Sequence, residues 1–196
     1  MGLYPALRTF PLERNTTIAQ ADPSSNVPVT LDSPALEVMT DLTRVKAATT
    51  QPTTSLRQAE QIMIYQGVRM LFVVTDMPSI EGLITTTDLR GDRQMRIVHE
   101  RNVTYDELNV ADVMTELAAL EAVDYAQVSV ETVGSAIATL KRLGRNHLLV
   151  VESESPRGPR RVRGVISRSQ IERQLGTAID LTPIASSFSE IERALL

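Results

Sequence analysis

The chain has 196 residues, of which 42% are hydrophobic, and its formal net charge is -4 at pH 7. This is enough apolar material for one or two folded domains, and the charge gives no basis for binding nucleic acid along a basic face. The absence of cysteine excludes disulfides, thiolate metal sites and cysteine nucleophiles. The chain has no apolar run near the roughly 18 residues of a membrane span and no secretory leader pattern. A soluble cytoplasmic protein without a membrane partner is expected.

Residues 1–33 carry prolines at a density that forbids a continuous helix. These are Pro5, Pro11, Pro23 and Pro28. The sequence therefore predicts an extended N-terminal arm, which is either a flexible tail or a segment packed on the body.

The first predicted unit spans residues 34–101. Leu56, Ala59 and Met63 recur at helical spacing directly after Ser55, which is a suitable helix cap. Two apolar strands joined by a turn follow, over 71–75 and 81–85, and a second helix is predicted from about 87 to 101.

The second predicted unit spans residues 109–176 and keeps this order. An apolar stripe marks its first helix, and its members are Val133, Ala136, Ile137, Leu140 and Leu143. Strands are predicted over 148–151 and 163–167, separated by a turn five residues longer than in the first unit. Ser169 and Glu172 are predicted to form a capping box, and Gly176 to end the helix.

Residues 177–196 form a predicted amphipathic tail. One helical face gathers its apolar residues, which are Ile184, Phe188, Ile191 and Leu195. Such a face requires a partner surface, either on the body or on a second subunit.

The two units match each other in sequence. The stretch 82–88 reads GLITTTD and its counterpart 164–170 reads GVISRSQ, while Val-Met-Thr occurs at 38–40 and again at 113–115. A tandem pair of this kind is expected to carry its function in the groove between the halves.

These motifs together resemble a tandem pair of CBS domains, the unit called a Bateman module, over about residues 34–176. The resemblance implies an α/β (α+β) fold in which two β-α-β-β-α repeats pack by pseudo-twofold symmetry. It also implies two clefts that take an adenine nucleotide or an S-adenosyl compound, and pairing of the modules into a homodimer.

Asp88 is the central candidate for ligand binding. A carboxylate at a helix start is held in a fixed direction, and its two oxygens suit the hydroxyls of a ribose. Ordinary helix capping is the alternative interpretation. Together with the resemblance, this predicts a nucleotide site formed by Gly82, Thr85, Thr87, Asp88, Arg69, Met70 and His147.

The second copy has Gln170 where the first has Asp88. A neutral amide cannot hold a diol in the same way, so the two clefts are expected to be unequal. The predicted weaker site comprises Gly164, Ser167, Gln170 and Asn146.

The chain has only two histidines and no recognised catalytic motif, so no enzymatic activity, metal site or obligatory cofactor is expected. The sequence predicts a stand-alone regulatory module that responds to an adenine ligand and acts in trans on a separate partner. An interaction scaffold with vestigial clefts is the alternative.

Overall fold

The computed structural model describes residues 28–153 and 158–180. The predicted arm is thus described only from residue 28 onward, and most of the predicted C-terminal tail lies outside the described residues. In this part of the chain no helix is long and apolar enough to cross a membrane.

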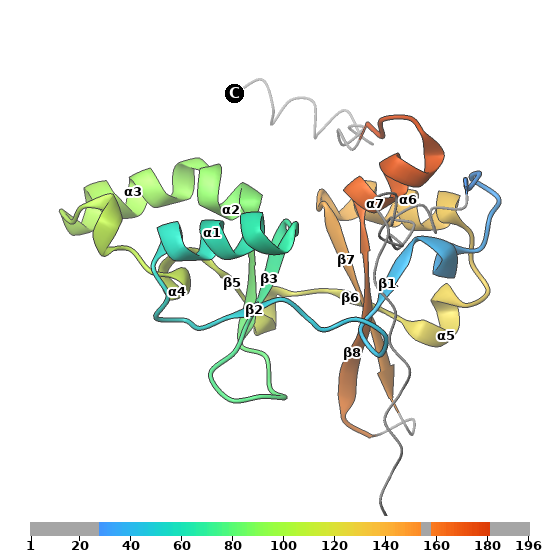
Figure 1. The fold of residues 1–196 in the computed structure, drawn as a ribbon, viewed down its shortest axis with the longest axis horizontal. Helices are drawn as coiled ribbons and strands as arrows, with labels where there is room; N and C mark the ends of the chain where they lie inside the picture. Colours follow the sequence, from blue (N-terminus) through green and yellow to red (C-terminus); the bar gives the residue numbers. More distant parts are fainter. Residues whose placement is uncertain (1–27, 154–157, 181–196) are drawn as a thin grey trace, which may run out of the picture.

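The first half contains a sheet covered by helices on one side (Figure 1). Ser55 caps its first helix by accepting a hydrogen bond from the Gln58 N–H, as predicted, and the helix buries Leu56, Ala59 and Met63. The elements of this half are β2 (Thr49–Thr50), α1 (Leu56–Gln66), β3 (Met70–Val73), β4 (Gly82–Thr85), α2 (Thr86–Arg90), α3 (Asp92–Arg101), the 3-10 turn η2 (Tyr105–Glu107) and α4 (Val110–Val113).

The second half repeats the arrangement around longer strands. Its elements are β6 (Ala122–Asp124), α5 (Tyr125–Val128), α6 (Val133–Leu143), β7 (His147–Ser153), β8 (Arg160–Ser167) and α7 (Arg168–Leu175). The predicted stripe of α6 points inward, since Val133, Ala136 and Leu140 are buried and Ile137 and Leu143 pack against the same core. Gly176 ends α7 in the left-handed conformation, as predicted.

Two sequence predictions about helices are wrong. The helix expected from 87 to 101 is interrupted by Gly91, which is extended (φ -82°, ψ 171°) and separates α2 from α3. The cap of α7 is Ser167, whose Oγ accepts from the Gln170 N–H, and not Ser169. Glu172 instead accepts hydrogen bonds from Arg168 Nε and from the Ile179 N–H.

The two sheets exchange their edge strands. The sheet orders are β2-β3-β4-β5 and β6-β7-β8-β1, where β1 is Met39–Asp41 and β5 is Thr115–Glu116. Each exchanged strand therefore completes the sheet of the other repeat, and Figure 1 shows β1, from the blue part of the chain, beside the orange β8. The 3-10 turn η1 (Ala35–Val38) leads into β1, and η3 (Leu117–Ala119) follows β5.

The exchange is symmetric and explains the repeated sequence. Thr40 pairs with Val165 just as Thr115 pairs with Leu83, so the two Val-Met-Thr motifs occupy equivalent places. The repeated glycine is required by this contact, because a Cβ on Gly82 would lie 2.4 Å from the Thr115 carbonyl oxygen. The unit boundaries 34–101 and 109–176 stay a prediction, and the sheets do not follow them.

Three hydrophobic clusters form the core. One lies within each half, and the third joins residues of both sheets, including Phe72 and Leu83 from the first and Leu149 and Val165 from the second. The two sheets thus pack against each other through their apolar faces, which brings the end of β4 close to the start of β7.

Candidate functional site

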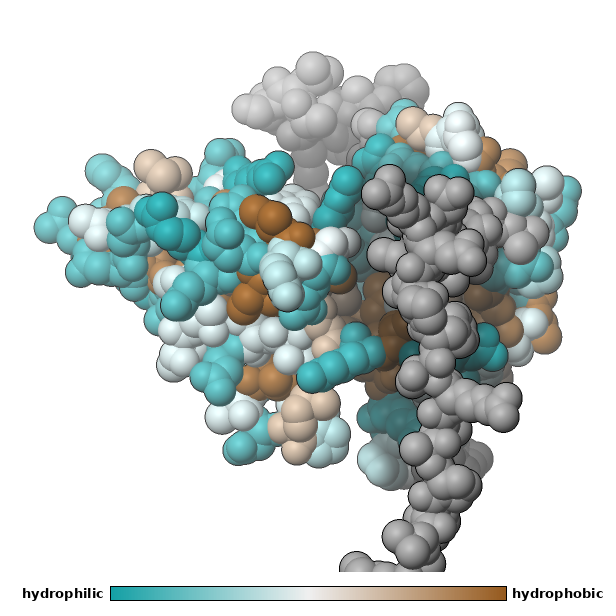
Figure 2. Space-filling view, in the orientation of Figure 1, coloured by the Kyte–Doolittle hydropathy of each residue, from teal (hydrophilic) through white to brown (hydrophobic). Residues whose placement is uncertain are grey.

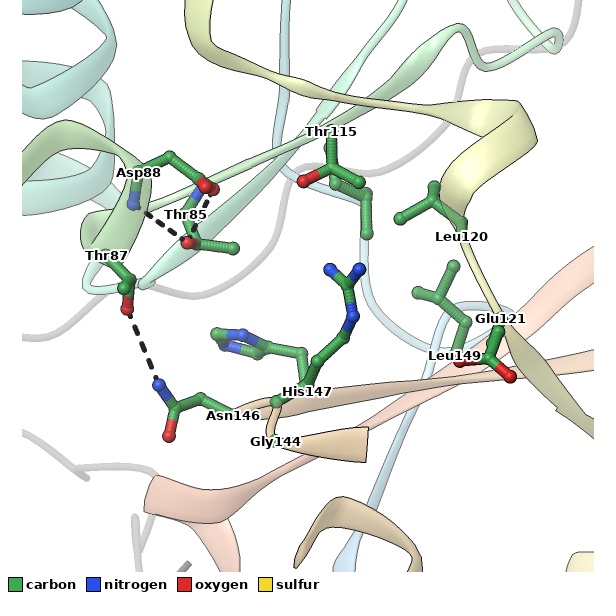
Figure 3. A pocket seen from close by; sticks show the side chains of 12 residues that line it. Thr85, Thr87, Asp88, Thr115, Leu120, Glu121, Gly144, Asn146, His147 and Leu149 are labelled. Atoms are coloured by element: carbon green, nitrogen blue, oxygen red, sulfur yellow. Dashed lines mark hydrogen bonds between the residues drawn. The ribbon is translucent and has the colours of Figure 1, made fainter. Parts of the chain in front are cut away.

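A pocket with about 630 Å³ of open space lies between the two repeats. Its lining combines the β4–α2 junction, the start of β7 and the segment that links the repeats (Figure 3). The lining residues are Leu83, Thr85, Thr87, Asp88, Thr115, Leu120, Glu121, Gly144, Arg145, Asn146, His147 and Leu149. The groove between the halves is therefore hollowed at the candidate residue Asp88.

Asp88 is fixed at the start of α2 by a reciprocal cap. Its Oδ2 accepts hydrogen bonds from the Thr85 N–H at 2.8 Å and from the Thr85 hydroxyl at 2.7 Å, while its own N–H donates to Thr85 Oγ1. The buried Gln94 amide donates to the Asp88 carbonyl and fastens α3 to the same turn. In the described part of the chain Asp88 Oδ1 accepts no hydrogen bond, so the capping role leaves one oxygen for a ligand.

Asn146 and His147 face this junction from the second repeat. Asn146 Nδ2 donates to Thr87 Oγ1 at 3.5 Å, a contact that joins the two repeats at one side of the pocket (Figure 3). Burial, together with the charge of Arg69, lowers the pKa of His147 to about 4. His147 is therefore a neutral imidazole at pH 7 and adds no positive charge to the pocket.

The other end of the pocket is apolar. Figure 3 shows Leu120 and Leu149 on the side away from Asp88, with Glu121 beside them. Leu83 and Leu149 belong to the cluster between the sheets, and Leu120 packs against it. The pocket thus has a polar end with a carboxylate and hydroxyls, and an apolar end suited to a flat ring.

The structure brings together five of the residues singled out from the sequence. Four of them were predicted for this site, namely Thr85, Thr87, Asp88 and His147. Asn146 joins them, although the sequence analysis placed it in the weaker site. The reason is that strand β7 begins opposite α2 of the other repeat, a crossing that the order of elements along the chain does not reveal.

Arg69 and Met70 do not line this pocket, although the charge of Arg69 acts on His147. They hold in β3 the positions that Asn146 and His147 hold in β7. Met70 is buried between the sheets. The charge of Arg69 also acts on Glu172 in α7. Burial raises the pKa of Glu172, but its carboxylate accepts hydrogen bonds from the Ile179 N–H and from Arg168. These bonds, with the charges of Arg168 and Arg69, hold the pKa of Glu172 below its ordinary value. Gly82 admits the exchanged strand β5 and does not line the pocket.

Seven lining residues were not among the predicted site residues. They are Leu83, Thr115, Leu120, Glu121, Gly144, Arg145 and Leu149. The echo of Val-Met-Thr at 113–115 was a usable signal for Thr115, since it marks the exchanged strand. The linker residues Leu120 and Glu121 gave no such signal, and Arg145 gave none because the equivalent residue of the first repeat is the apolar Val68.

The equivalent position in the second copy is arranged differently. Gln170 Nε2 donates to Gln174 Oε1 at 3.0 Å, and Arg173 donates to Gln170 Oε1. Gln174 is buried and in turn donates to the Glu37 carbonyl. Ser167 caps α7, and Gly164 admits strand β1. These contacts bind the Gln170 side chain to its own helix, whereas Asp88 keeps an oxygen open.

No group of three or more acidic, histidine or cysteine side chains capable of holding a metal ion occurs among residues 28–153 and 158–180.

Comparison with known proteins finds one family model and several solved structures that are similar to this chain. The CBS domain family model matches residues 35–92. A conserved protein from Pyrococcus horikoshii superposes with a TM-score of 0.52 at 21% identity, covering 74% of this chain and 93% of that one. Protein MJ1225 from Methanocaldococcus jannaschii superposes with a TM-score of 0.50 at 21% identity, covering 71% of this chain and 49% of that one.

A third solved structure, that of CBSX2 from Arabidopsis thaliana in complex with AMP, gives a TM-score of 0.49 at 18% identity and covers 72% of this chain and 94% of that one. A comparison with curated proteins finds no match. The CBS domain model thus matches the first copy, and the described body has a fold similar to that of the Pyrococcus horikoshii protein, with the same kind of sheet repeated in the second copy.

Proposed function

We propose that this protein is a regulatory module that binds an adenine nucleotide or S-adenosyl compound in the pocket between its repeats and acts on a separate partner protein. The observation that carries the proposal is the pairing of Asp88 with an opposing apolar wall in one pocket. A nucleoside matches this arrangement, because it has the polar diol of its ribose at one end and a flat base at the other.

Asp88 is the group proposed to hold the ribose. Its Oδ1 is open and its Oδ2 is oriented by Thr85, so the carboxylate meets a diol without first reorganising. Thr87 and Asn146 add a hydroxyl and an amide at the same end, while Leu83 and Leu149 supply apolar contact for adenine. A ligand held by both repeats changes their relative arrangement only if it binds the two arrangements unequally.

The two clefts are proposed to differ, with the Asp88 pocket as the principal site. Gln170 is occupied by Gln174 and Arg173 and supplies no carboxylate. The alternative function is an interaction scaffold. It is supported by this second cleft, because its candidate residues Gly164, Ser167 and Gln170 make contacts that stabilise the fold.

A thermal-melting screen across AMP, ADP, ATP and S-adenosylmethionine tests the proposal. A ligand that binds only the folded chain stabilises it by about 2.7 kcal/mol at 100 times its Kd. We expect at least one compound to raise the Tm, and Asp88→Asn, which keeps a capping oxygen, to abolish the rise.

The chain offers a matched control. Thr104 donates its N–H and hydroxyl to one oxygen of Glu107 at 2.7 and 2.8 Å, the same cap as at Thr85 and Asp88 but outside the pocket. Glu107→Gln is expected to lose a similar amount of basal stability and to keep the response to the ligand. A chain whose Tm and calorimetric titration are unmoved by every compound would refute nucleotide sensing and favour the scaffold.

Pairing into a homodimer is part of the proposal. Hydrophobic patches lie over α1 in Figure 2, where Ile64 and Tyr65 are 65% and 92% exposed. Apolar side chains at such exposure fit an interface with a second copy. Neither an obligatory cofactor nor catalysis is proposed, and the proposed compartment is the cytoplasm.

A further inference from the structure

Arg145 is held at the pocket by the cap that ends α6. Gly144 is left-handed (φ 59°) and donates its N–H to the Lys141 carbonyl at 3.1 Å, while the Arg145 N–H donates to the Leu140 carbonyl at 3.2 Å. This pair of bonds is a Schellman motif, which fixes the direction of the chain as it leaves the helix. The backbone of Arg145 is therefore set by the fold, and its exposed side chain lines the pocket.

The first repeat has the same cap with a different residue. Gly67 donates to Ile64 and the Val68 N–H donates to Met63, so Val68 stands where Arg145 stands in the second repeat. Val68 is partly buried and packs against the core of the first half. The same backbone device thus presents a cation in one copy and an apolar side chain in the other.

Arg145 is also the one positively charged residue among the described residues that line this pocket. Among the lining residues the charged groups are Asp88, Glu121 and Arg145. His147 is neutral at pH 7 because burial disfavours its charged form. Arg69, which the sequence analysis assigned to a phosphate, does not line the pocket.

We propose that Arg145 is the specificity-determining residue that makes the Asp88 pocket prefer a nucleoside 5′-phosphate over the nucleoside alone. A guanidinium presents paired N–H donors that match two oxygens of a phosphate. Without Arg145 the charged residues lining the pocket would be Asp88 and Glu121, whose carboxylates oppose a phosphate. This inference rests on the proposed nucleotide-binding function and adds the group that reads the phosphate.

Calorimetric titration with adenosine and with AMP tests the assignment at constant ionic strength. In the unaltered protein AMP is expected to bind more tightly than adenosine. Arg145→Gln is expected to weaken AMP binding about tenfold, the order expected for loss of a hydrogen bond between charged groups, and to change adenosine binding less than about twofold. Arg145→Lys, which keeps the charge but not the fork, should recover part of the AMP affinity.

Arg142→Gln is the matched control, since Arg142 is an exposed arginine on the last turn of α6 that does not line the pocket and its loss changes the net charge equally. It should leave both affinities unchanged. If AMP and adenosine bind equally, or if Arg145→Gln lowers both affinities alike, the assignment of Arg145 is overturned while nucleotide binding stands. If neither compound binds the unaltered protein, the proposed function fails and this inference fails with it.

Discussion

Replacing Gly82 by alanine tests whether the exchanged strand is packed as described. A Cβ at Gly82 would lie 2.4 Å from the Thr115 carbonyl oxygen and 3.3 Å from the Glu116 Cα, both backbone atoms that no side-chain rotation can move. Ordinary contact begins at 3.4 Å, so β5 must retreat by about 1 Å (3.4 − 2.4). Overpacking costs about 1–3 kcal/mol, and weakening the β4–β5 hydrogen bonds adds about 1 kcal/mol. A loss of about 3 kcal/mol is expected, or roughly 6–12 °C in Tm for a chain of this size.

Urea unfolding followed by circular dichroism measures this loss, with Gly67→Ala as the reference. Gly67 is left-handed but has nothing within 4 Å of its added Cβ, so its replacement costs only about 1–2 kcal/mol of conformational strain. Gly164→Ala should fall between the two, because its closest contact is the flexible Met39 Sδ at 2.6 Å. If Gly82→Ala proves no less stable than Gly67→Ala, β5 does not cross Gly82 as closely as described.

Two further predictions concern charge and pH. Because the pKa of His147 is about 4 in the folded chain against 6.5 when unfolded, the unfolded state takes up the proton first as the pH falls. The protein should lose roughly 2 kcal/mol between pH 7 and 4.5, and unfolding across pH should show less of this acid loss in His147→Gln; an undiminished loss in that variant would contradict the reasoning. Arg163 donates to Asp41 at 3.0 Å and is 23% exposed, whereas Arg44 reaches the same carboxylate at 3.8 Å and is 85% exposed. Denaturant titration should show a larger loss of stability for Arg163→Met than for Arg44→Ala, and equal losses would contradict the ranking by burial.

The fold was predictable because its signals are local. The cap at Ser55, the stripe of α6 and the stop at Gly176 are each determined within a few residues, and the structure confirms them. The break at Gly91 was missed because the polar residues on both sides of it are equally compatible with one continuous helix.

The candidate site was predictable only where its residues share one segment. Thr85, Thr87 and Asp88 follow one strand, so their association needs no knowledge of the other half. Arg69 and Asn146 directly precede β3 and β7, and which helix faces them depends on how the two sheets cross. That crossing is a long-range contact, and periodicity within one repeat carries no information about it.

The strand exchange has a consequence for how the molecule is made. β1 is synthesised first, yet Thr40 finds its partner Val165 only 125 residues later. The second sheet cannot close until nearly the whole body exists, and such distant pairing slows folding. An N-terminal fragment that ends between the repeats would contain β1 without its partner β8, and it would lack β5, which pairs with β4. The two fragments produced by such a cut should therefore reassemble with each other rather than fold alone.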